Sequence, residues 1–162
     1  MKTPLFLICL AGLGLGGCAM GPPYPQAVGP AAVPTGATTL TTADKAPFGT
    51  FIVDGPGRSV YILDGTRASS GAMACGFDCA RVWPPVMASS PPTLGAGLDP
   101  RRLGTAPRGG GTQLTYAGWP LFYYVRDRGP GDTTGQHITD AWGTWHLLAP
   151  SGEPIWPAGG GY

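Results

Sequence analysis

The chain has 162 residues and a formal net charge of +1, with 10 Lys and Arg against 9 Asp and Glu. A chain this close to neutral lacks the dense positive charge that attracts phosphates, so we expect no nucleic-acid partner. Its 28 Gly and 19 Pro approach the level of a disordered polymer, but 43% hydrophobic residues and five Trp do not fit disorder throughout. We predict one compact, turn-rich domain joined to a disordered segment.

An apolar stretch begins shortly after Lys2 and ends at Leu15-Gly-Gly-Cys18. A basic start, a short apolar run and small residues before a cut site are the layout of a secretory signal. The last four residues resemble the lipobox of bacterial lipoproteins. The resemblance implies that residues 1–17 are a signal peptide and that Cys18 becomes the lipidated first residue. The alternative is an ordinary secreted protein in which Cys18 is incidental.

Lipidation of Cys18 implies a lipid membrane as partner, because several acyl chains together give stable anchoring. We therefore expect a bacterial cell-envelope protein whose domain faces the periplasm or the cell surface. Ala19 follows the cysteine, and an acid there would have resembled a signal for inner-membrane retention. The outer membrane is accordingly the predicted destination. No second apolar stretch approaches the roughly 18 residues that a membrane-spanning helix needs.

Residues 18–46 have the composition of a tether. Pro alternates there with Gly, Ala and Thr, and the apolar residues follow neither a helical nor a strand period. Such a segment buries too little apolar surface to offset the entropy lost on ordering. We predict that residues 18–46 are disordered, that the domain spans residues 47–157, and that residues 158–162 form a flexible tail.

Six segments of the domain have strand character: residues 48–53, 58–63, 112–116, 119–125, 145–149 and 153–156. The first two flank the turn Asp54-Gly-Pro-Gly57, and the next two flank Ala117-Gly118, so each pair is a predicted hairpin. Short helical turns are expected at 75–83 and 99–103.

A 22-residue spacing from Tyr to Trp occurs twice, from Tyr61 to Trp83 and from Tyr123 to Trp145. We interpret this spacing as an internal duplication. The predicted fold class is therefore all-β: a small, pseudo-duplicated hairpin domain with Gly/Pro-rich loops and a short helical segment near Cys75–Cys79.

Two cysteines remain once the signal peptide and Cys18 are set aside. Cys75 and Cys79 have three residues between them, and on one helical turn this spacing brings the Cα atoms within disulfide range. A disulfide can persist in the oxidising compartment that the signal implies. A redox pair or a metal site is the alternative, although redox pairs of the thioredoxin type have two intervening residues.

Several stretches resemble the bacterial secreted-repeat lipoprotein family, whose members carry two copies of a unit with a Tyr-x-aromatic-x-x-Asp motif. The matching stretches are Val60-Tyr-Ile-Leu63, Cys75-Gly-Phe-Asp-Cys-Ala80, Val82-Trp-Pro-Pro85, Leu114-Thr-Tyr-Ala-Gly-Trp-Pro-Leu121, Arg128-Gly-Pro-Gly-Asp-Thr133, Gly135-Gln136 and Trp145-His146. In the first motif Leu63 and Thr66 replace the aromatic residue and the Asp, and in the second Phe122 replaces the Tyr. The resemblance covers about residues 48–150 and implies no particular activity, because the family is uncharacterised.

Side chains suited to catalysis or metal binding are sparse. His137 and His146 are the only histidines, and neither helical ligand spacing nor a Cys-x-x-Cys-His haem attachment is present. A strand histidine that packs beside Trp145 and bonds to a backbone carbonyl is the commoner case. We therefore predict no catalytic residue, no metal ligand and no cofactor. The alternative is a periplasmic redox lipoprotein that binds haem or a transition metal through His146, with His137 as a second ligand.

Aromatic residues crowd the second half of the chain. Alternation along a strand places Phe122 and Tyr124 on one face and Tyr123 on the other. One face should be core, and the other either packs as well or forms a platform for a sugar, a peptide or a planar cofactor. We expect a non-catalytic domain that binds or scaffolds an unidentified envelope component. The candidate binding residues are Tyr123, Tyr124, Asp127, Trp145 and His146.

Overall fold

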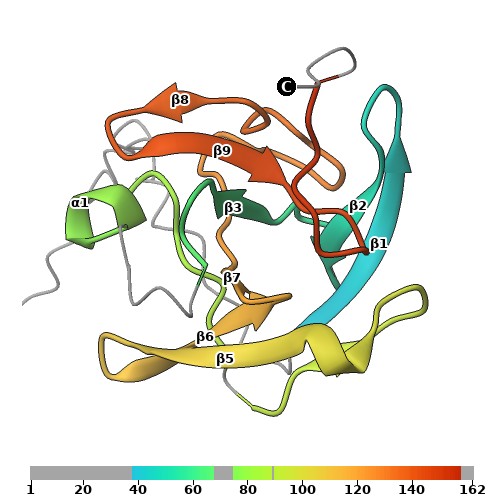
Figure 1. Cartoon of the computed structure of the whole chain (residues 1–162), viewed down its shortest axis with the longest axis horizontal. Helices are drawn as coiled ribbons and strands as arrows, with labels where there is room; N and C mark the ends of the chain where they lie inside the picture. The colour runs from blue at the N-terminus through green and yellow to red at the C-terminus, as the bar shows by residue number, and fades with distance from the viewer. Residues whose placement is uncertain (1–37, 68–74, 89, 158–162) are drawn as a thin grey trace, which may run out of the picture. The chain divides into compact units, whose positions relative to one another are not determined.

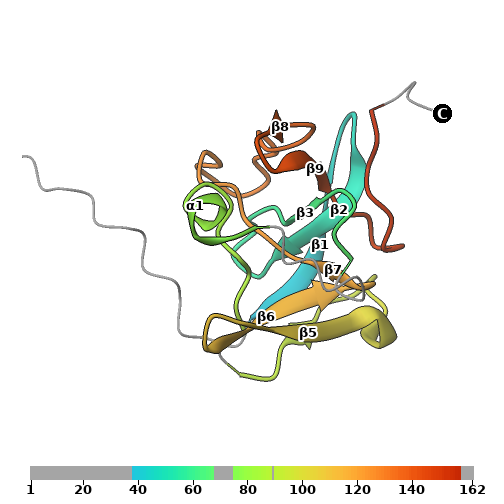
Figure 2. The same cartoon turned by 60° about the vertical axis from the view of Figure 1, so that its left-hand side comes forward.

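The computed structural model describes residues 38–67, 75–88 and 90–157. These residues form a mainly β domain with three small sheets (Figures 1 and 2). They also contain one short α-helix, α1 (Phe77–Ala80), and one turn of 3-10 helix, η2 (Pro100–Arg102). The predicted all-β fold with a short helical segment is therefore confirmed.

Several predicted segments lie outside the described residues. They are the signal peptide 1–17, the lipidated Cys18, residues 19–37 of the tether and the tail 158–162. In the part of the chain that the structure describes, no helix has both the length and the apolar character needed to cross a membrane.

The first sheet has the strand order β2-β1-β4. Strand β1 (Thr39–Lys45) pairs antiparallel with β2 (Gly49–Asp54) and parallel with β4 (Thr93–Leu94). This corrects the prediction that residues 39–45 belong to a disordered tether. The β-branched threonines suit a pleated strand, and the fully buried Leu40 anchors it in the core.

The second sheet has the order β3-β9-β8, and both pairings are antiparallel. Its strands are β3 (Tyr61–Leu63), β8 (Thr139–Asp140) and β9 (Gly143–Leu147). The strand predicted at 58–63 starts only at Tyr61, and the strand predicted at 145–149 is shifted toward Gly143. Both strands are present, so the sequence located them and missed their ends.

The third sheet has the order β5-β6-β7 and is antiparallel. It consists of β5 (Leu103–Arg108), β6 (Gly111–Tyr116) and β7 (Trp119–Pro120), with β5 and β6 forming the long hairpin at the bottom of Figure 1. Strand β5 was not predicted, because Gly104 and Pro107 disfavour strands in sequence. Its position at the edge of the sheet tolerates a residue without a backbone N–H.

Two predicted strands are shorter in the structure or absent. The strand expected at 119–125 ends at Pro120, and Phe122 then makes isolated bridges to Tyr61 and Pro85. The segment 153–156 forms no named strand; Pro154 makes one isolated bridge. Phe122 thus bridges two neighbours, whereas residues 153–155 pair with residues 147–149: Ala149 N donates to Glu153 O and Ile155 N donates to Leu147 O, both at 2.9 Å.

Hydrogen bonds between distant segments support the internal duplication. Ile52 N donates to Leu148 O at 2.9 Å, and Leu114 N donates to Val86 O at 2.8 Å. Ile52 and Leu114 lie 62 positions apart in sequence, as do Val86 and Leu148. Equivalent residues of the two halves therefore form the same hydrogen bond to the opposite half, as expected for two copies of one unit that pack against each other.

The core has two clusters of buried residues, and neighbouring strand residues alternate between them. Phe122 and Tyr124 belong to the cluster that contains the disulfide, whereas Tyr123 packs against the other. The predicted alternation along this segment is therefore confirmed.

Candidate functional site

Three stacked aromatic rings fill the middle of the first cluster. The Trp83 ring centroid lies 4.0 Å from that of Trp145 and 4.2 Å from that of Tyr124, with interplanar angles of 9° and 23°. None of the three residues is more than 7% exposed. Tyr124 and Trp145, two of the candidate binding residues, thus have their rings covered by Trp83. This arrangement favours the alternative in which both aromatic faces pack in the core.

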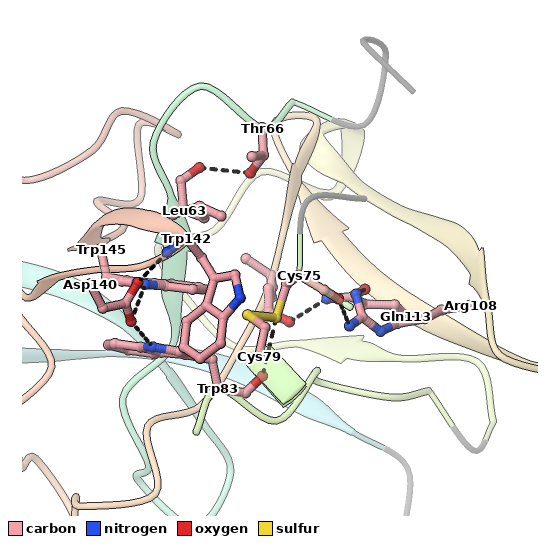
Figure 3. The surroundings of a disulfide bond; sticks show 11 residues. Leu63, Thr66, Cys75, Cys79, Trp83, Arg108, Gln113, Asp140, Trp142 and Trp145 are labelled. Atoms are coloured by element: carbon pink, nitrogen blue, oxygen red, sulfur yellow. Dashed lines mark hydrogen bonds between the residues drawn. A yellow bond between two sulfur atoms is a disulfide. The ribbon is translucent and has the colours of Figure 1, made fainter. Parts of the chain in front are cut away.

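One carboxylate holds two of these indoles. Asp140 Oδ2 accepts hydrogen bonds from Trp83 Nε1 at 2.7 Å and from Trp145 Nε1 at 3.1 Å, and its Oδ1 accepts from Trp142 N at 2.9 Å (Figure 3). Buried indole N–H groups need an acceptor, and Asp140 supplies one for both copies of the Trp. Its position five residues before Trp145 was the only signal for this role in the sequence.

The tyrosine of the first motif bonds to the aspartate of the second. Tyr61 Oη donates to Asp127 Oδ2 at 2.8 Å, while Asp127 Oδ1 accepts from Thr134 N at 2.9 Å and Thr134 Oγ1 at 2.6 Å. Burial, and next the negative charge of Asp127, raise the pKa of Tyr61 above its ordinary value. Tyr61 therefore stays a neutral donor, and both Asp127 oxygens are used inside the fold.

The reciprocal link is absent, because both of its partners are replaced. Phe122 stands where a second Tyr would donate, and it contacts the Trp145 ring edge-on at 5.2 Å. Thr66 stands where the first Asp would accept, and its Oγ1 donates to Leu63 O at 2.7 Å. The Phe122 ring thus packs against an apolar neighbour, and the Thr66 hydroxyl forms a hydrogen bond to the backbone three residues earlier.

Tyr123 belongs to a separate polar cluster on the other side of its segment. Tyr123 Oη donates to Asp54 Oδ2 at 2.9 Å, and Arg58 bonds the same carboxylate at 2.7 Å. The Arg58 guanidinium also lies 4.0 Å from the centroid of the Tyr123 ring. Burial is the main cause that raises the pKa of Tyr123, followed by the Asp54 charge.

The predicted disulfide is present. Cys75, two residues before α1, is bonded to Cys79 within α1, and their Cα atoms are 5.0 Å apart. Arg108 donates to Cys75 O and also to Gln113 Oε1 at 3.1 Å, and burial lowers its pKa (Figure 3). Both cysteines are at most 2% exposed, whereas reactive cysteines are accessible, so the geometry fits a structural bond.

The two histidines lie side by side. Their ring centroids are 4.8 Å apart at an interplanar angle of 83°, and the Trp156 ring lies 4.4 Å from that of His146. His146 is fully buried, whereas His137 is exposed. Within the described residues, no group of three or more His, Cys, Asp or Glu side chains is placed to hold a metal ion.

The predicted backbone-carbonyl partner, that of Ile155, interacts only weakly with His146. Neither its Nδ1 nor its Nε2 forms a hydrogen bond among the described residues. Burial, and next His137, lower the pKa of His146, while Asp64 and the backbone of Ile155 oppose this change. The Ile155 carbonyl acts on the ring without reaching hydrogen-bond geometry, and it already accepts from Gln136 Nε2 at 2.7 Å.

Each of the five candidate binding residues has a neighbour within the fold. Tyr124 and Trp145 are core residues, Tyr123 bonds to Asp54, Asp127 bonds to Tyr61, and His146 lies beside His137. The sequence identified the aromatic and histidine positions but not the partner that each one contacts.

Residues 104–149 match the model of a lipoprotein family described as a secreted repeat of unknown function. The matched segment contains the second motif, with Phe122, Tyr124 and Asp127. No curated protein and no solved structure matches the chain. The resemblance seen in the sequence is thus confirmed over residues 104–149, which carry the secreted repeat of this lipoprotein family, and this repeat implies an extracytoplasmic location.

Proposed function

We propose that the chain is a lipid-anchored protein of the bacterial envelope, whose β domain binds or scaffolds an envelope component without catalysis. The sequence Leu15-Gly-Gly-Cys18 and the Pro-rich segment after it support a tethered anchor. An outer-membrane location is part of the proposal, because Ala19 is not an acidic retention residue.

The observation that carries the non-catalytic role is the use of the carboxylates. Asp54 accepts hydrogen bonds from Tyr123 and Arg58. Asp127 accepts hydrogen bonds from Tyr61 and from Thr134. Asp140 likewise accepts hydrogen bonds from the indoles of Trp83 and Trp145. A general acid or base must reach a substrate proton within hydrogen-bond distance. These carboxylates instead accept hydrogen bonds from donors of the fold, and this use supports the proposal of a non-catalytic domain.

A binding role is supported by an exposed aromatic residue on α1. Phe77 is 81% exposed, although it is large and apolar, and Arg81 lies 5.6 Å from its ring centroid. Burial of a Phe side chain against a partner is favourable by roughly 1.5–3 kcal/mol. The disulfide at Cys75–Cys79 constrains the turn that presents Phe77. We therefore propose α1 as the surface that meets the envelope component.

The binding proposal is tested by a photo-reactive amino acid placed at Phe77 in the full-length protein in cells. The matched control carries it at Ala96, an exposed residue of the loop after β4. We expect a defined crosslinked product from position 77 and none from position 96. Equal labelling from the two positions, or none from either, would contradict binding through α1.

The anchor is tested separately, by Cys18→Ser. Loss of the lipidated thiol should release the protein into the soluble fraction or leave it as an uncleaved precursor. A variant that is processed normally and stays membrane-bound in high salt would show that another anchor exists.

A further inference from the structure

We propose that His137 and His146 form a binding site for a first-row transition-metal cation, with copper the preferred ion and the indole of Trp156 beside it. This inference goes beyond the proposed function, and it depends neither on the lipid anchor nor on the α1 surface.

His146 supplies the first reason. The side chain is 0% exposed, and neither ring nitrogen has a hydrogen-bond partner among the described residues. Buried polar groups are normally paired, so two unpaired nitrogens on one ring require an explanation. The neutral imidazole is the form that binds metals. A metal ion would satisfy the lone pair of one nitrogen.

His137 supplies the second reason. Its backbone has φ +62°, in the left-handed region that residues other than Gly seldom occupy, and its N–H donates to Trp145 O at 2.9 Å. Such backbone conformations cluster at functional sites, where the surrounding structure holds them. Here the conformation accompanies a ring centroid 4.8 Å from that of His146. Two imidazoles that bind one tetrahedral ion at about 2.0–2.1 Å have centroids about 5 Å apart.

The surroundings also suit a cation. The Trp156 ring lies 4.4 Å from the ring of His146 and 6.3 Å from that of His137. An indole attracts a cation near its face. The pair is thus bordered by an aromatic ring that can attract a cation.

The ligand set selects the class of metal. Imidazole nitrogen suits copper, zinc and nickel, and copper binds most tightly of the divalent first-row ions. No third His, Cys, Asp or Glu joins the pair among the described residues. Two protein ligands leave the remaining positions open to water or to a small anion. We therefore expect an exchangeable site and not a closed structural one.

The test uses the full-length protein in detergent, titrated with Cu²⁺ and separately with Zn²⁺. Binding is followed by calorimetry, and electron paramagnetic resonance reports nitrogen ligands on Cu²⁺. We expect one high-affinity Cu²⁺ per chain with imidazole nitrogen coupling, and weaker Zn²⁺ binding. The chain contains only two histidines, so His137→Asn with His146→Gln removes every imidazole.

Each single variant should weaken Cu²⁺ binding at least tenfold. His137→Asn is the decisive one, because His137 is exposed and Asn tolerates the left-handed conformation, so the fold should be kept. Asp78→Asn, which removes an exposed carboxylate on α1 and neither imidazole, is the control and should retain the stoichiometry and the nitrogen coupling. Unchanged Cu²⁺ affinity in His137→Asn, or an absence of nitrogen coupling in the wild type, would overturn the proposal.

Discussion

Tyr61 donates a 2.8 Å hydrogen bond to Asp127, so the tyrosine of the first motif is held by the aspartate of the second. Tyr61 and Phe122, the leading residues of the two motifs, also exchange backbone hydrogen bonds of 2.8 and 2.9 Å. In this chain the motif therefore joins the two copies. Only one of two symmetric side-chain links is present, because Phe122 has no hydroxyl and Thr66 has no carboxylate.

Tyr61→Phe should destabilise the domain by about 1.5–3 kcal/mol, the range for a hydrogen bond to a charged group. Urea unfolding of Tyr61→Phe, Asp127→Asn and the double variant gives the coupling between the two residues. We expect the double variant to lose less stability than the sum of the single variants. Strict additivity would show that the 2.8 Å contact contributes nothing of its own.

The missing link should be restorable. Phe122→Tyr together with Thr66→Asp places a phenol and a carboxylate at the positions that correspond to Tyr61 and Asp127. Each single change should destabilise, because both sites are at most 8% exposed and would bury an unpaired polar group. The pair should recover stability, with a coupling of about 0.5–3 kcal/mol. Unfolding measurements that show no coupling would contradict the proposed equivalence of the two motifs.

The sequence predicted the elements whose signals are local. The turns at residues 54–57 and 117–118 and the alternation around Tyr123 depend on neighbouring residues, and the structure has them. Strands β1 and β5 were missed because their Thr-, Gly- and Pro-containing sequences form strands only when a partner strand lies beside them.

The contacts of the candidate site could not be predicted from neighbouring residues in the sequence. The residues joined by the Tyr61–Asp127 bond are 66 positions apart, and the indole of Trp83 bonds to Asp140, 57 positions away. Each bond depends on how the two copies exchange strands. Periodicity gives the face on which a side chain lies, but it does not give the element that covers that face.

Asp140→Asn should destabilise the domain by about 1–3 kcal/mol. In the wild type Oδ2 accepts from both Trp83 Nε1 and Trp145 Nε1, and an amide nitrogen in that position cannot accept. The near-ultraviolet circular dichroism signal should also change, because Asp140 holds the stacked indoles of Trp83 and Trp145 in place. The matched control is Asp78→Asn, at the exposed corresponding position 62 residues earlier, which should change stability by less than about 0.5 kcal/mol. Equal effects of the two changes would argue against a special role for Asp140.

Removal of the disulfide by Cys75→Ser with Cys79→Ser should cost about 2 kcal/mol, the chain-entropy value for so short a loop. The wild type under reductant should show the same loss, measured as a lower Tm. A structural bond predicts a folded, less stable domain in both cases. A domain whose Tm is identical with and without the bond would contradict this prediction.

Stability should also depend on pH through His146. Its pKa is lowered in the folded domain, by burial first and by His137 second, whereas an unfolded histidine titrates near about 6.5. Between these two pKa values the unfolded chain binds more protons than the folded one, so the free energy of unfolding rises with pH. We therefore expect stability to fall as the pH drops below about 6.5, and to level off above it. Urea unfolding between pH 5 and 8 with a chelator present measures this slope.

Two variants separate His146 from the other titrating groups. His146→Gln should flatten the slope in this window, because the group whose pKa differs between the two states is gone. His137→Asn should keep a reduced slope, since the burial of His146 persists while the repulsion from its neighbour is lost. Asp99 and Asp132, whose pKa values are lowered by hydrogen bonds, titrate well below pH 5 and add little there. An unchanged slope in His146→Gln would assign the pH dependence to another group. It would also show that the lowered pKa of His146 has no effect on the free energy of unfolding.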